Sequence, residues 1–366
     1  MKKKILFSAY TLDVGGIETA LVSLLNNLIH RYDITLVLEK KQGVFLERLD
    51  SKIQIVEYNP NQNKNPLIRK SINLMKRIKF IAKYKNKYDF AASFATYSKM
   101  GSFCARMASK NNALWGHLDY TKLFENKNEM IEFFKFIKYN KFLHIIFVSE
   151  EGANSFKESF PDVKNKVIAC NNLIDYNKII KMAEQKININ KENITTFLNV
   201  GRHEEKQKRL SRIIEASKKL KNDNLQFRVL LVGDGPDTEK YKKTVQKYKL
   251  EENIIFYGRK NNPYPYFNIA DCIILSSEYE GYPVVFVEAL TLNKPIITTD
   301  VSDAKMDIDG KFGIVTDKNV NSIYEAMKKV IKKEIFIEQT FNPQIFNKEI
   351  IDEIDKLING GNNAKN

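Results

Sequence analysis

The chain has 366 residues, a length that indicates about two domains. Hydrophobic residues make up 43% of the sequence and charged residues 28%, which excludes a disordered or fibrous protein. The net charge of +15 favours an anionic partner, which can be nucleic acid, an anionic membrane surface or a phosphorylated small molecule.

Short apolar strands alternate with helical stretches in the first half of the chain. A loop with Gly15-Gly16 separates the first strand from a helix whose apolar residues recur at helical spacing. This alternation predicts an α/β fold with a parallel sheet. The predicted strands are residues 5–9, 34–38, 53–57, 89–94 and 144–149.

The second half of the chain restarts the same pattern. Its predicted strands are residues 196–200, 227–232, 254–257, 272–275 and 295–298, with helices at 213–220 and 345–357. Each strand ends at a small, polar or glycine-rich turn, and open α/β sheets bind their ligands at these carboxyl ends. We therefore predict two Rossmann-like domains, residues 1–175 and 190–340, with a polar linker at 181–193. The C-terminal helix, residues 345–360, is expected to pack back on the first domain.

The cysteines and the N-terminus bear on the cellular compartment. Cys104, Cys170 and Cys272 are far apart and form no C-x-x-C pair, which fits a reducing cytosol. The apolar run after the initial lysines is too short for a signal peptide, and no segment approaches about 18 apolar residues. We expect a cytoplasmic protein that is soluble or peripheral on the inner face of the plasma membrane.

Two glycine-containing motifs lie at predicted strand ends. Gly15-Gly16 permits a close approach of the backbone to an anion at the next helix, and an ordinary turn is an equally open interpretation. Gly201-Arg202 is followed by Lys206 and Lys208. A planar arginine fork and a mobile lysine can hold a diphosphate from two sides, and a solvated helix start is the alternative.

The most specific motif runs from Glu280 to Glu288. Pro283 suits the first position of a helix, and Gly281 leaves the backbone N–H groups of that helix open to a phosphate. Glu288 lies in an apolar run, where a carboxylate is costly to bury without a partner. Carboxylates at this place can accept hydrogen bonds from sugar hydroxyls, so we interpret the motif as a functional site.

The chain resembles family 4 retaining glycosyltransferases over nearly its whole length, most strongly over residues 196–316. The matching residues in chain order are Gly15-Gly16, His117, Gly201-Arg202, Lys208, Gly233-Asp234-Gly235-Pro236, Glu280, Glu288 and Thr299-Asp300. The resemblance implies the GT-B fold, with two facing Rossmann-like domains and a cleft between them. It implies transfer of a hexosyl or N-acetylhexosaminyl group from a UDP- or GDP-sugar to a glycan or lipid-linked acceptor in cell-envelope polysaccharide synthesis.

The resemblance also assigns roles to individual residues. Arg202 and Lys208 match the pair that binds the diphosphate and stabilises the charge of the leaving group. Glu280 matches the carboxylate near the transferred sugar, Glu288 the one that bonds the ribose, and His117 the histidine that contacts the sugar. The remaining donor-binding residues are Gly15 and Gly16 in the loop over the donor, Gly258 and Arg259 near the base, and Gly281, Tyr282 and Pro283.

The sequence departs from the family pattern in two places. Lys208 is followed by Arg209 where the family usually has glycine, and the spacing from Arg202 is slightly long, so Lys206 is an alternative diphosphate lysine. Residues 301–304 lack the glycine pair common after Asp300.

The D-x-D sequence at residues 307–309 is typical of a metal–diphosphate site in the other large glycosyltransferase fold. We interpret it here as a solvent turn and predict no required metal or other cofactor.

The positive charge is concentrated in the first half. Residues 1–180 hold 29 Lys and Arg against 17 Asp and Glu, a net of +12, whereas residues 181–366 hold 30 against 27, a net of +3. Residues 64–87 contain nine cations and no acid, interleaved with apolar residues at helical spacing. Such a helix can lie on an anionic membrane surface, although ordinary packing with lysines outward is the alternative.

A basic nucleic-acid-binding protein and another GT-B enzyme, such as a nucleotide-sugar epimerase, are the rival functions. No nucleic-acid-binding module is visible, so we expect no nucleic-acid partner.

Overall fold

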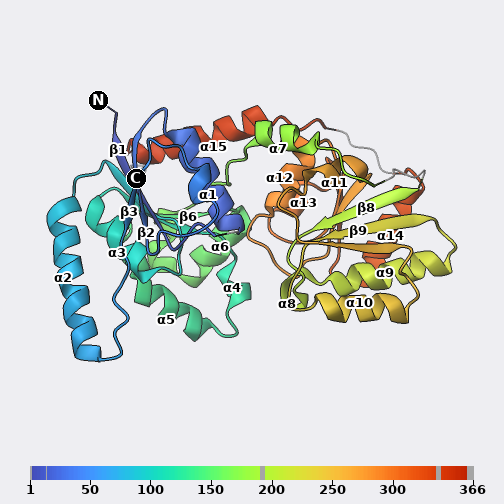
Figure 1. Ribbon diagram of the computed structural model, residues 1–366, viewed down its shortest axis with the longest axis horizontal. Coiled ribbons are helices and arrows are strands. Elements are labelled where there is room, and N and C mark those ends of the chain that lie inside the picture. Colours follow the sequence, from blue (N-terminus) through green and yellow to red (C-terminus); the bar gives the residue numbers. More distant parts are fainter. Residues whose placement is uncertain (1, 14, 190–193, 335–338, 361–366) are drawn as a thin grey trace. The chain divides into compact units, whose positions relative to one another are not determined.

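The computed structural model describes residues 2–13, 15–189, 194–334 and 339–360 (Figure 1). It divides into two compact units. Unit 1 comprises Met1–Leu173 and Ile345–Asn366, and unit 2 comprises Ile174–Gln344. Each unit is built around its own parallel sheet, which confirms the predicted α/β fold with two Rossmann-like domains.

Within the described residues, unit 1 holds a seven-stranded parallel sheet in the order β3-β2-β1-β4-β5-β6-β7. The strand order reverses direction on either side of β1, as in doubly wound sheets. The strands are β1 (Lys4–Ala9), β2 (Asp33–Leu38), β3 (Gln54–Glu57), β4 (Phe90–Ser93), β5 (Asn112–Gly116), β6 (His144–Phe147) and β7 (Val167–Ala169). The sequence patterns did not predict β5 and β7, because β5 begins with a polar residue and β7 has three residues.

The helices of unit 1 connect these strands. They are α1 (Gly16–Leu28), α2 (Pro66–Tyr84), α3 (Lys99–Ala108), α4 (Tyr120–Leu123), α5 (Lys127–Ile137), α6 (Glu150–Ser159) and the C-terminal α15 (Pro343–Ile358). Short 3-10 turns lie at Leu46–Arg48, Tyr139–Lys141 and Pro161–Lys166. One core cluster joins Leu6 and Leu114 of the sheet to Phe134 of α5 and Phe156 of α6. Burial of such side chains contributes about 1.5–3 kcal/mol each, which holds the helices on the sheet.

Helix α15 is joined to unit 1 by polar contacts at its C-terminal end. Asp355 pairs with Arg31, and its Oδ1 accepts a 2.6 Å hydrogen bond from the Tyr32 hydroxyl. The Asn111 side chain donates to the carbonyl oxygen of Leu357 at 2.9 Å. Because Ile354 and Leu357 are also buried, the C-terminal helix is part of this unit although it follows unit 2 in sequence.

Unit 2 holds a six-stranded parallel sheet, counted over its described residues, in the order β10-β9-β8-β11-β12-β13. The strands are β8 (Thr195–Val200), β9 (Phe227–Val232), β10 (Ile254–Gly258), β11 (Cys272–Leu275), β12 (Ile296–Thr299) and β13 (Gly313–Thr316), of which β13 was not predicted. The helices are α7 (Tyr176–Ala183), α8 (Glu205–Lys208), α9 (Leu210–Asn222), α10 (Thr238–Lys247), α11 (Tyr264–Ile269), α12 (Val284–Thr291), α13 (Ala304–Asp307) and α14 (Val320–Ile331).

Alternate residues of the unit 2 strands enter two cores. Phe197 of β8 packs with α9, α10 and α14, whereas the next residue, Leu198, packs with α11 and α12. This period of two places helices on both faces of the sheet and leaves its carboxyl edge to the connecting loops.

The expected linker at residues 181–193 differs in part from the structure. Its first residues belong to α7, whose Ala183 is buried, and Asn268 of α11 donates to the Ala183 carbonyl at 2.6 Å. The polar start of the expected linker is therefore the end of a packed helix and not a free connection. Residues 190–193 of the expected linker lie outside the described residues.

Candidate active site

The predicted residues of unit 2 gather at the carboxyl edge of its sheet. Gly201-Arg202 follows β8, Gly258 ends β10, and Glu280 lies in the loop between β11 and α12. Because all the strands are parallel, these three connections lie on the same edge. The structure thus brings together residues that are far apart in sequence.

An ion pair between Lys208 and Glu280 lies within this edge. Lys208 Nζ is 2.5 Å from Glu280 Oε1, although 72 residues separate the two in sequence. Glu280 is buried at 7% exposure, and the Lys208 side chain is 22% exposed. A buried carboxylate is costly without a partner, so this lysine supplies the charge that Glu280 requires.

Two further side chains hold the Glu280 carboxylate. The Ser277 hydroxyl donates to Oε1 at 2.7 Å, and the Gln207 amide donates to Oε2 at 3.4 Å. Thr299 fixes this turn from the next strand by donating to the Ser277 carbonyl at 2.6 Å. The carboxylate is therefore oriented by β11, β12 and α8 together.

Arg209 sets the turn between α8 and α9 that carries Lys208. Its backbone has φ 49°, in the left-handed region. This region costs a residue other than glycine about 1–2 kcal/mol, so glycine would adopt this turn with less strain than Arg209 does. The structure therefore explains the departure at Arg209 as a strained turn that other contacts must maintain.

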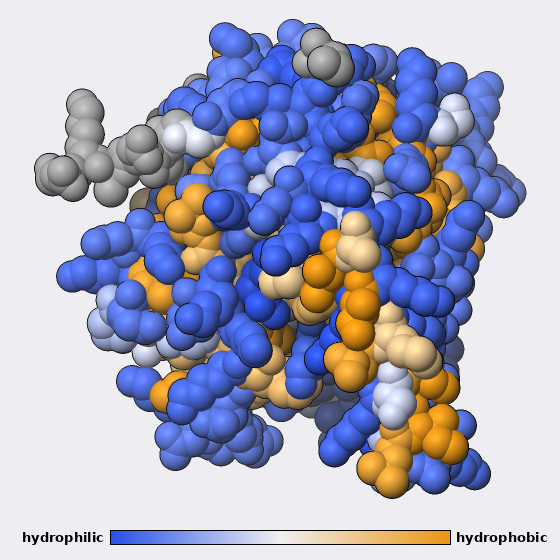
Figure 2. Space-filling model, turned by 90° about the vertical axis from the view of Figure 1, so that its left-hand side faces the viewer, coloured by the Kyte–Doolittle hydropathy of each residue, from blue (hydrophilic) through white to orange (hydrophobic). Residues whose placement is uncertain are grey.

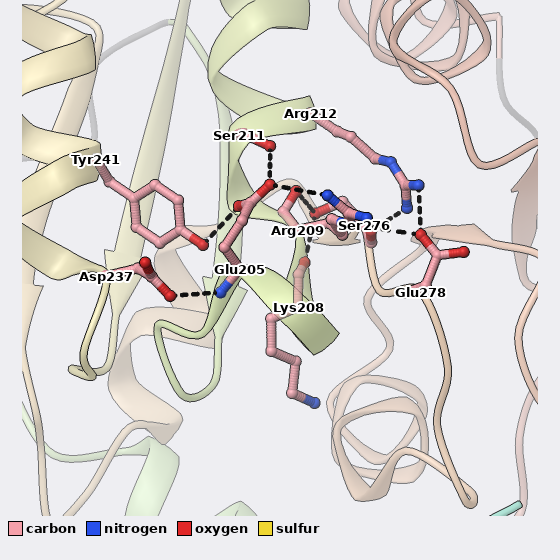
Figure 3. Close-up of polar contacts among 9 residues, drawn as sticks. All are labelled: Glu205, Lys208, Arg209, Ser211, Arg212, Asp237, Tyr241, Ser276 and Glu278. Atoms are coloured by element: carbon pink, nitrogen blue, oxygen red, sulfur yellow. Dashed lines mark hydrogen bonds and ion pairs between the residues drawn. The ribbon is translucent and has the colours of Figure 1, made fainter. Parts of the chain in front are cut away.

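Side chains around Arg209 supply those contacts (Figure 3). Its guanidinium lies 3.4 Å from Glu205 and 3.4 Å from Glu278, and Arg212 pairs with the same Glu278 at 2.6 Å. The Ser276 hydroxyl lies 2.9 Å from the carbonyl oxygens of both Lys208 and Arg209. We call Glu205, Arg209, Arg212, Ser276 and Glu278 the turn network, because together they hold the backbone on which Lys208 stands.

Glu205 extends the turn network to neighbouring helices. Its carboxylate accepts hydrogen bonds from Ser211 at 2.6 Å and Tyr241 at 2.8 Å, and its backbone N–H donates to Asp237 at 2.8 Å (Figure 3). The Glu205 contacts therefore tie α8 to α9 and α10. The sequence offered no signal for these partners of Glu205.

Arg202 and Lys206 are open to solvent, unlike Lys208. The Arg202 side chain is 68% exposed and lies 3.4 Å from Glu204. Lys206 is also exposed, whereas Lys208 turns toward Glu280. Of the two alternative lysines, Lys208 is the one that the structure joins to the predicted carboxylate.

Close backbone approach explains the glycines beside Arg202. A Cβ at Gly233, where φ is 152°, would lie 1.8 Å from the carbonyl oxygen of Gly201. A Cβ at Gly235 would lie 2.3 Å from the carbonyl oxygen of His203. The turn after β9 therefore requires glycine at both positions, because it packs directly against the backbone of the turn after β8.

The segment from Gly281 to Glu288 lies at the start of α12. Pro283 was predicted to be the first residue of this helix. The helix begins at Val284, so Pro283 is instead the residue before it. Glu288 is half-buried and accepts a 2.9 Å hydrogen bond from the Tyr264 hydroxyl. Burial raises the pKa of Glu288 to about 7, against which the Tyr264 hydrogen bond acts.

The other predicted donor residues of unit 2 lie in nearby loops. Gly258 has φ 66°, and its carbonyl accepts the N–H of Gly233 at 3.0 Å, which joins β10 to the turn after β9. Arg259 is exposed directly after it. Ser302, in the loop after Asp300, donates to the carbonyl of Gly281, and Tyr282 hydrogen-bonds Asp307.

The D-x-D residues are engaged within the fold. Asp309 Oδ1 accepts the backbone N–H of Val315 at 3.0 Å. Burial raises the pKa of Asp307, which the Tyr282 hydrogen bond opposes. Asp307 thus ends α13 as a half-buried residue bound to Tyr282, which differs from the predicted solvent turn, whereas Asp309 is exposed and contacts β13.

In unit 1, the predicted residues lie at the carboxyl edge of its own sheet. Gly15 caps α1, and a Cβ there would lie 2.2 Å from the Glu18 carboxylate, whereas a Cβ at Gly16 would meet nothing within 4 Å. His117 follows β5 and is buried.

His117 is a neutral imidazole with a defined tautomer. Its Nε2 lies 2.7 Å from the carbonyl oxygen of Phe94, so Nε2 carries the proton. Burial lowers the pKa of His117 to about 4. Nδ1 is buried and, among the described residues, has no hydrogen-bond partner, so it can accept one more hydrogen bond.

Comparisons with known proteins identify the class. Residues 181–342 match the family model described as glycosyl transferases group 1. An uncharacterized glycosyltransferase of Methanocaldococcus jannaschii is 28% identical over 197 residues, 48% of each chain. The N-acetylgalactosamine-N,N'-diacetylbacillosaminyl-diphospho-undecaprenol 4-alpha-N-acetylgalactosaminyltransferase of Campylobacter jejuni is 24% identical over 341 residues, 89% of each chain. Anabaena HepE, solved in complex with UDP, has a TM-score of 0.78 at 15% identity, covering 96% of this chain and 100% of that one.

The two sheets give the chain the GT-B fold, and residues 181–342 match the glycosyl transferases group 1 model, as expected of a glycosyltransferase. Residues 181–342 form its glycosyl transferases group 1 domain, which contains Lys208, Glu280 and the turn network. Of the functions that the sequence left open, the match favours the glycosyltransferase.

The Arg209 turn gives a first test. Arg209→Ala removes the ion pairs and keeps the left-handed strain, whereas Arg209→Gly removes the same pairs and relieves that strain. We expect the glycine variant to be more stable than the alanine variant by about 1 kcal/mol in the free energy of unfolding of unit 2. Urea unfolding of both variants checks this difference. Equal stability of the two would contradict the strained turn.

Proposed function

We propose that this glycosyltransferase is a retaining member of family 4. It transfers a sugar from a UDP- or GDP-sugar to a hydroxyl of a glycan or lipid-linked acceptor in cell-envelope polysaccharide synthesis. The observation that carries the proposal is the Lys208–Glu280 ion pair at the carboxyl edge of the unit 2 sheet. It places a cation suited to a diphosphate beside a carboxylate suited to sugar hydroxyls.

The donor is held along this edge. The exposed Arg202 fork and Lys208 bind the diphosphate, and Glu280 accepts hydrogen bonds from the transferred sugar. Glu288 bonds the ribose, and Gly258-Arg259 lies near the base. The positive charge for the diphosphate comes from these side chains, so the proposal requires no metal. A UDP donor is favoured by the complex of Anabaena HepE with UDP.

The reaction follows from where charge develops. As the bond from the sugar to the diphosphate breaks, negative charge grows on the leaving oxygen, and Lys208 and Arg202 stabilise it. The acceptor hydroxyl attacks the same face, and its proton passes to the leaving oxygen. The sugar is thereby transferred with its anomeric configuration kept.

His117 and the Gly15-Gly16 loop complete the proposal from unit 1. The free acceptor atom of His117, Nδ1, suits a hydroxyl of the transferred sugar. Gly15 and Gly16 permit a close approach of their backbone to the donor. The low pKa of His117 keeps the ring neutral near pH 7, so its role is hydrogen bonding rather than charge.

A lysine comparison tests the site. Lys208→Ala should lower kcat by about 10²–10³-fold, because it removes charge stabilisation of the leaving diphosphate. Lys206→Ala removes an exposed lysine from the same short helix and should leave kcat within about twofold. Release of UDP with product formation measures transfer, and thermal unfolding shows whether each variant is folded. Near-normal transfer by a folded Lys208→Ala variant would refute the site.

We further propose that the enzyme is peripheral on the cytoplasmic leaflet and attaches through α2. No described helix has the length and apolarity needed to cross a bilayer. Only Phe80 and Tyr84 of α2 are buried, whereas Leu67, Ile68, Leu74, Met75 and Ile78 are exposed. Figure 2 views the protein from the side on which α2 lies and shows apolar side chains in a stripe among hydrophilic ones. We call these five residues the apolar stripe.

The cations of α2 suit the same surface. The same helix carries Arg69, Lys70, Lys76, Arg77, Lys79 and Lys83, and it contains no acid. Each cation near an anionic leaflet contributes about 1 kcal/mol, and each apolar side chain that inserts adds to it.

Vesicle flotation tests the attachment. The protein should float with vesicles that contain phosphatidylglycerol and remain below with phosphatidylcholine alone. Leu74→Ser with Ile78→Ser should lower the bound fraction by about tenfold, because insertion of two apolar side chains is lost. Met306→Ser, at an equally exposed apolar residue of unit 2, is the control and should bind as before. Equal flotation with both vesicle types would contradict the proposal.

A further inference from the structure

A row of three cations lies on the surface of unit 1 where helices α2, α3 and α5 meet. Lys99, Phe103 and Arg106 are spaced by four and three residues, which places them on one face of α3. Arg77 of α2 lies over the middle of this face, with its guanidinium 5.5 Å from the centre of the Phe103 ring. Helix α3 packs against both α2 and α5, so the row follows a junction of three helices (Figure 1). We call Lys99, Arg77 and Arg106 the cation row.

Aromatic rings, rather than acids, hold the cation row in place. Lys99 Nζ lies 3.7 Å from the centre of the Phe136 ring of α5, and the Arg106 guanidinium lies 6.0 Å from the centre of the Phe142 ring. Arg106 is half-buried, and its Nε donates to the Ser102 hydroxyl at 3.4 Å. Cation–π contacts position a charged group without neutralising it. The three charges are therefore ordered and still available to an anion.

The charge of the cation row is not compensated within the fold. Among the residues that the structure describes, none of its three members forms an ion pair, and helices α2 and α3 contain no acid. Glu132 of α5 pairs instead with Lys135 at 3.1 Å. Burial, with added repulsion from Arg77, lowers the pKa of Lys99 and of Arg106. An anion bound at the row would relieve this repulsion.

Exposed apolar side chains lie beside the cation row. Leu74, a member of the apolar stripe, precedes Arg77 by three residues on α2, so their side chains are neighbours on the helix surface. Phe136, whose ring contacts Lys99, is 54% exposed. Cations next to exposed apolar groups suit the boundary between lipid headgroups and acyl chains.

The length of the cation row indicates more than one phosphate. Lys99 and Arg106 are seven residues apart, which corresponds to about 10 Å along the axis of α3. A single phosphate group cannot contact both ends of such a row. An anionic leaflet presents many phosphates side by side, so it can engage the whole row at once.

We propose that the cation row binds the phosphate groups of anionic membrane lipids, so that α3 and α5 lie on the leaflet together with α2. Arg77 and Arg106 supply planar forks for phosphate oxygens, and Lys99 supplies a point charge. The inference rests on the proposed attachment through α2 and deepens it, because it names the lipid group that is recognised. It also orients unit 1, since Phe136 then reaches the acyl boundary.

Vesicle flotation tests the charges of the row. Arg77→Gln with Arg106→Gln should weaken binding to phosphatidylglycerol vesicles by about tenfold or more, because phosphate contacts are lost. Arg69→Gln with Lys79→Gln removes two exposed cations of α2 outside the row and should weaken binding by about threefold or less. Equal losses would overturn the proposal, because charge alone would then explain binding. Arg77→Gln with Lys99→Gln, at two exposed positions, repeats the test if thermal unfolding shows the first variant to be unfolded.

Fluorescence quenching locates the bound surface. Trp115 is the one tryptophan of the sequence and is buried, so a second tryptophan reports on its own position. Phe136→Trp should be quenched by phosphatidylglycerol vesicles with brominated acyl chains. Met306→Trp, at an equally exposed residue of unit 2, is the control and should not be quenched. An unquenched Phe136→Trp variant that still floats would overturn the three-helix surface and leave attachment through α2 in place.

Inorganic phosphate distinguishes a free anion from a lipid. Because the row engages several lipid phosphates at once, phosphate and chloride of equal ionic strength should release the protein from vesicles to the same extent. Release by phosphate at a much lower ionic strength than chloride would reveal a site for a single free phosphate. That result would overturn the assignment to lipids.

Donor hydrolysis separates this inference from the proposed function. Release of UDP from UDP-sugars without vesicles should be the same in the Arg77→Gln, Arg106→Gln variant and the native protein. A native protein that releases UDP and does not float with phosphatidylglycerol vesicles would overturn both the attachment and the cation row. A native protein that releases no UDP from any donor, while the row variant still loses vesicle binding, refutes the proposed transfer and leaves the cation row in place.

Discussion

The pairing of Lys208 with Glu280 is the constraint on which the unit 2 site depends. It joins the short helix after β8 to the loop after β11, and neither side chain is suited to its place without the other. Removal of one member of a buried pair commonly costs about 3–5 kcal/mol, a large part of the roughly 5–15 kcal/mol by which proteins are stable. The same two groups have the chemistry that a sugar diphosphate needs, so the site is charged and organised before a donor arrives.

Neighbouring turns and side chains of unit 2 hold that pair in position. The left-handed turn at Arg209 aims Lys208, and the turn network opposes the strain of that turn. The glycines at 233 and 235 let the neighbouring turns approach closely. In unit 1, the residue at the carboxyl edge of the sheet that was predicted to contact the donor is the neutral His117, and the positive charge lies on helix α2. The net charge of +12 in residues 1–180 thus has a structural location, in a helix whose apolar side chains remain uncovered.

The sequence predicted the strands that read as continuous apolar runs, and it predicted Lys208 and Glu280 through their family pattern. It did not predict β5, β7 or β13, since Asn112 and Gly313 begin two of them and β7 has only three residues. It also missed Ser277, Gln207 and Tyr264, whose hydrogen bonds orient the carboxylates. Gln207 and Tyr264 are far from these carboxylates in sequence, and only the tertiary fold brings them together, whereas Ser277 contacts Glu280 from three residues away. In the sequence, Arg209 departed from the family pattern. In the structure, its backbone is left-handed and its side chain pairs with Glu205 and Glu278.

A crystal structure of the protein with UDP tests the central claim most directly. We expect the diphosphate to lie within hydrogen-bond distance of Lys208 Nζ and the Arg202 guanidinium, with the ribose hydroxyls on Glu288. A diphosphate bound away from Lys208, with the Lys208–Glu280 pair untouched, would show that the pair is only structural and would contradict the account.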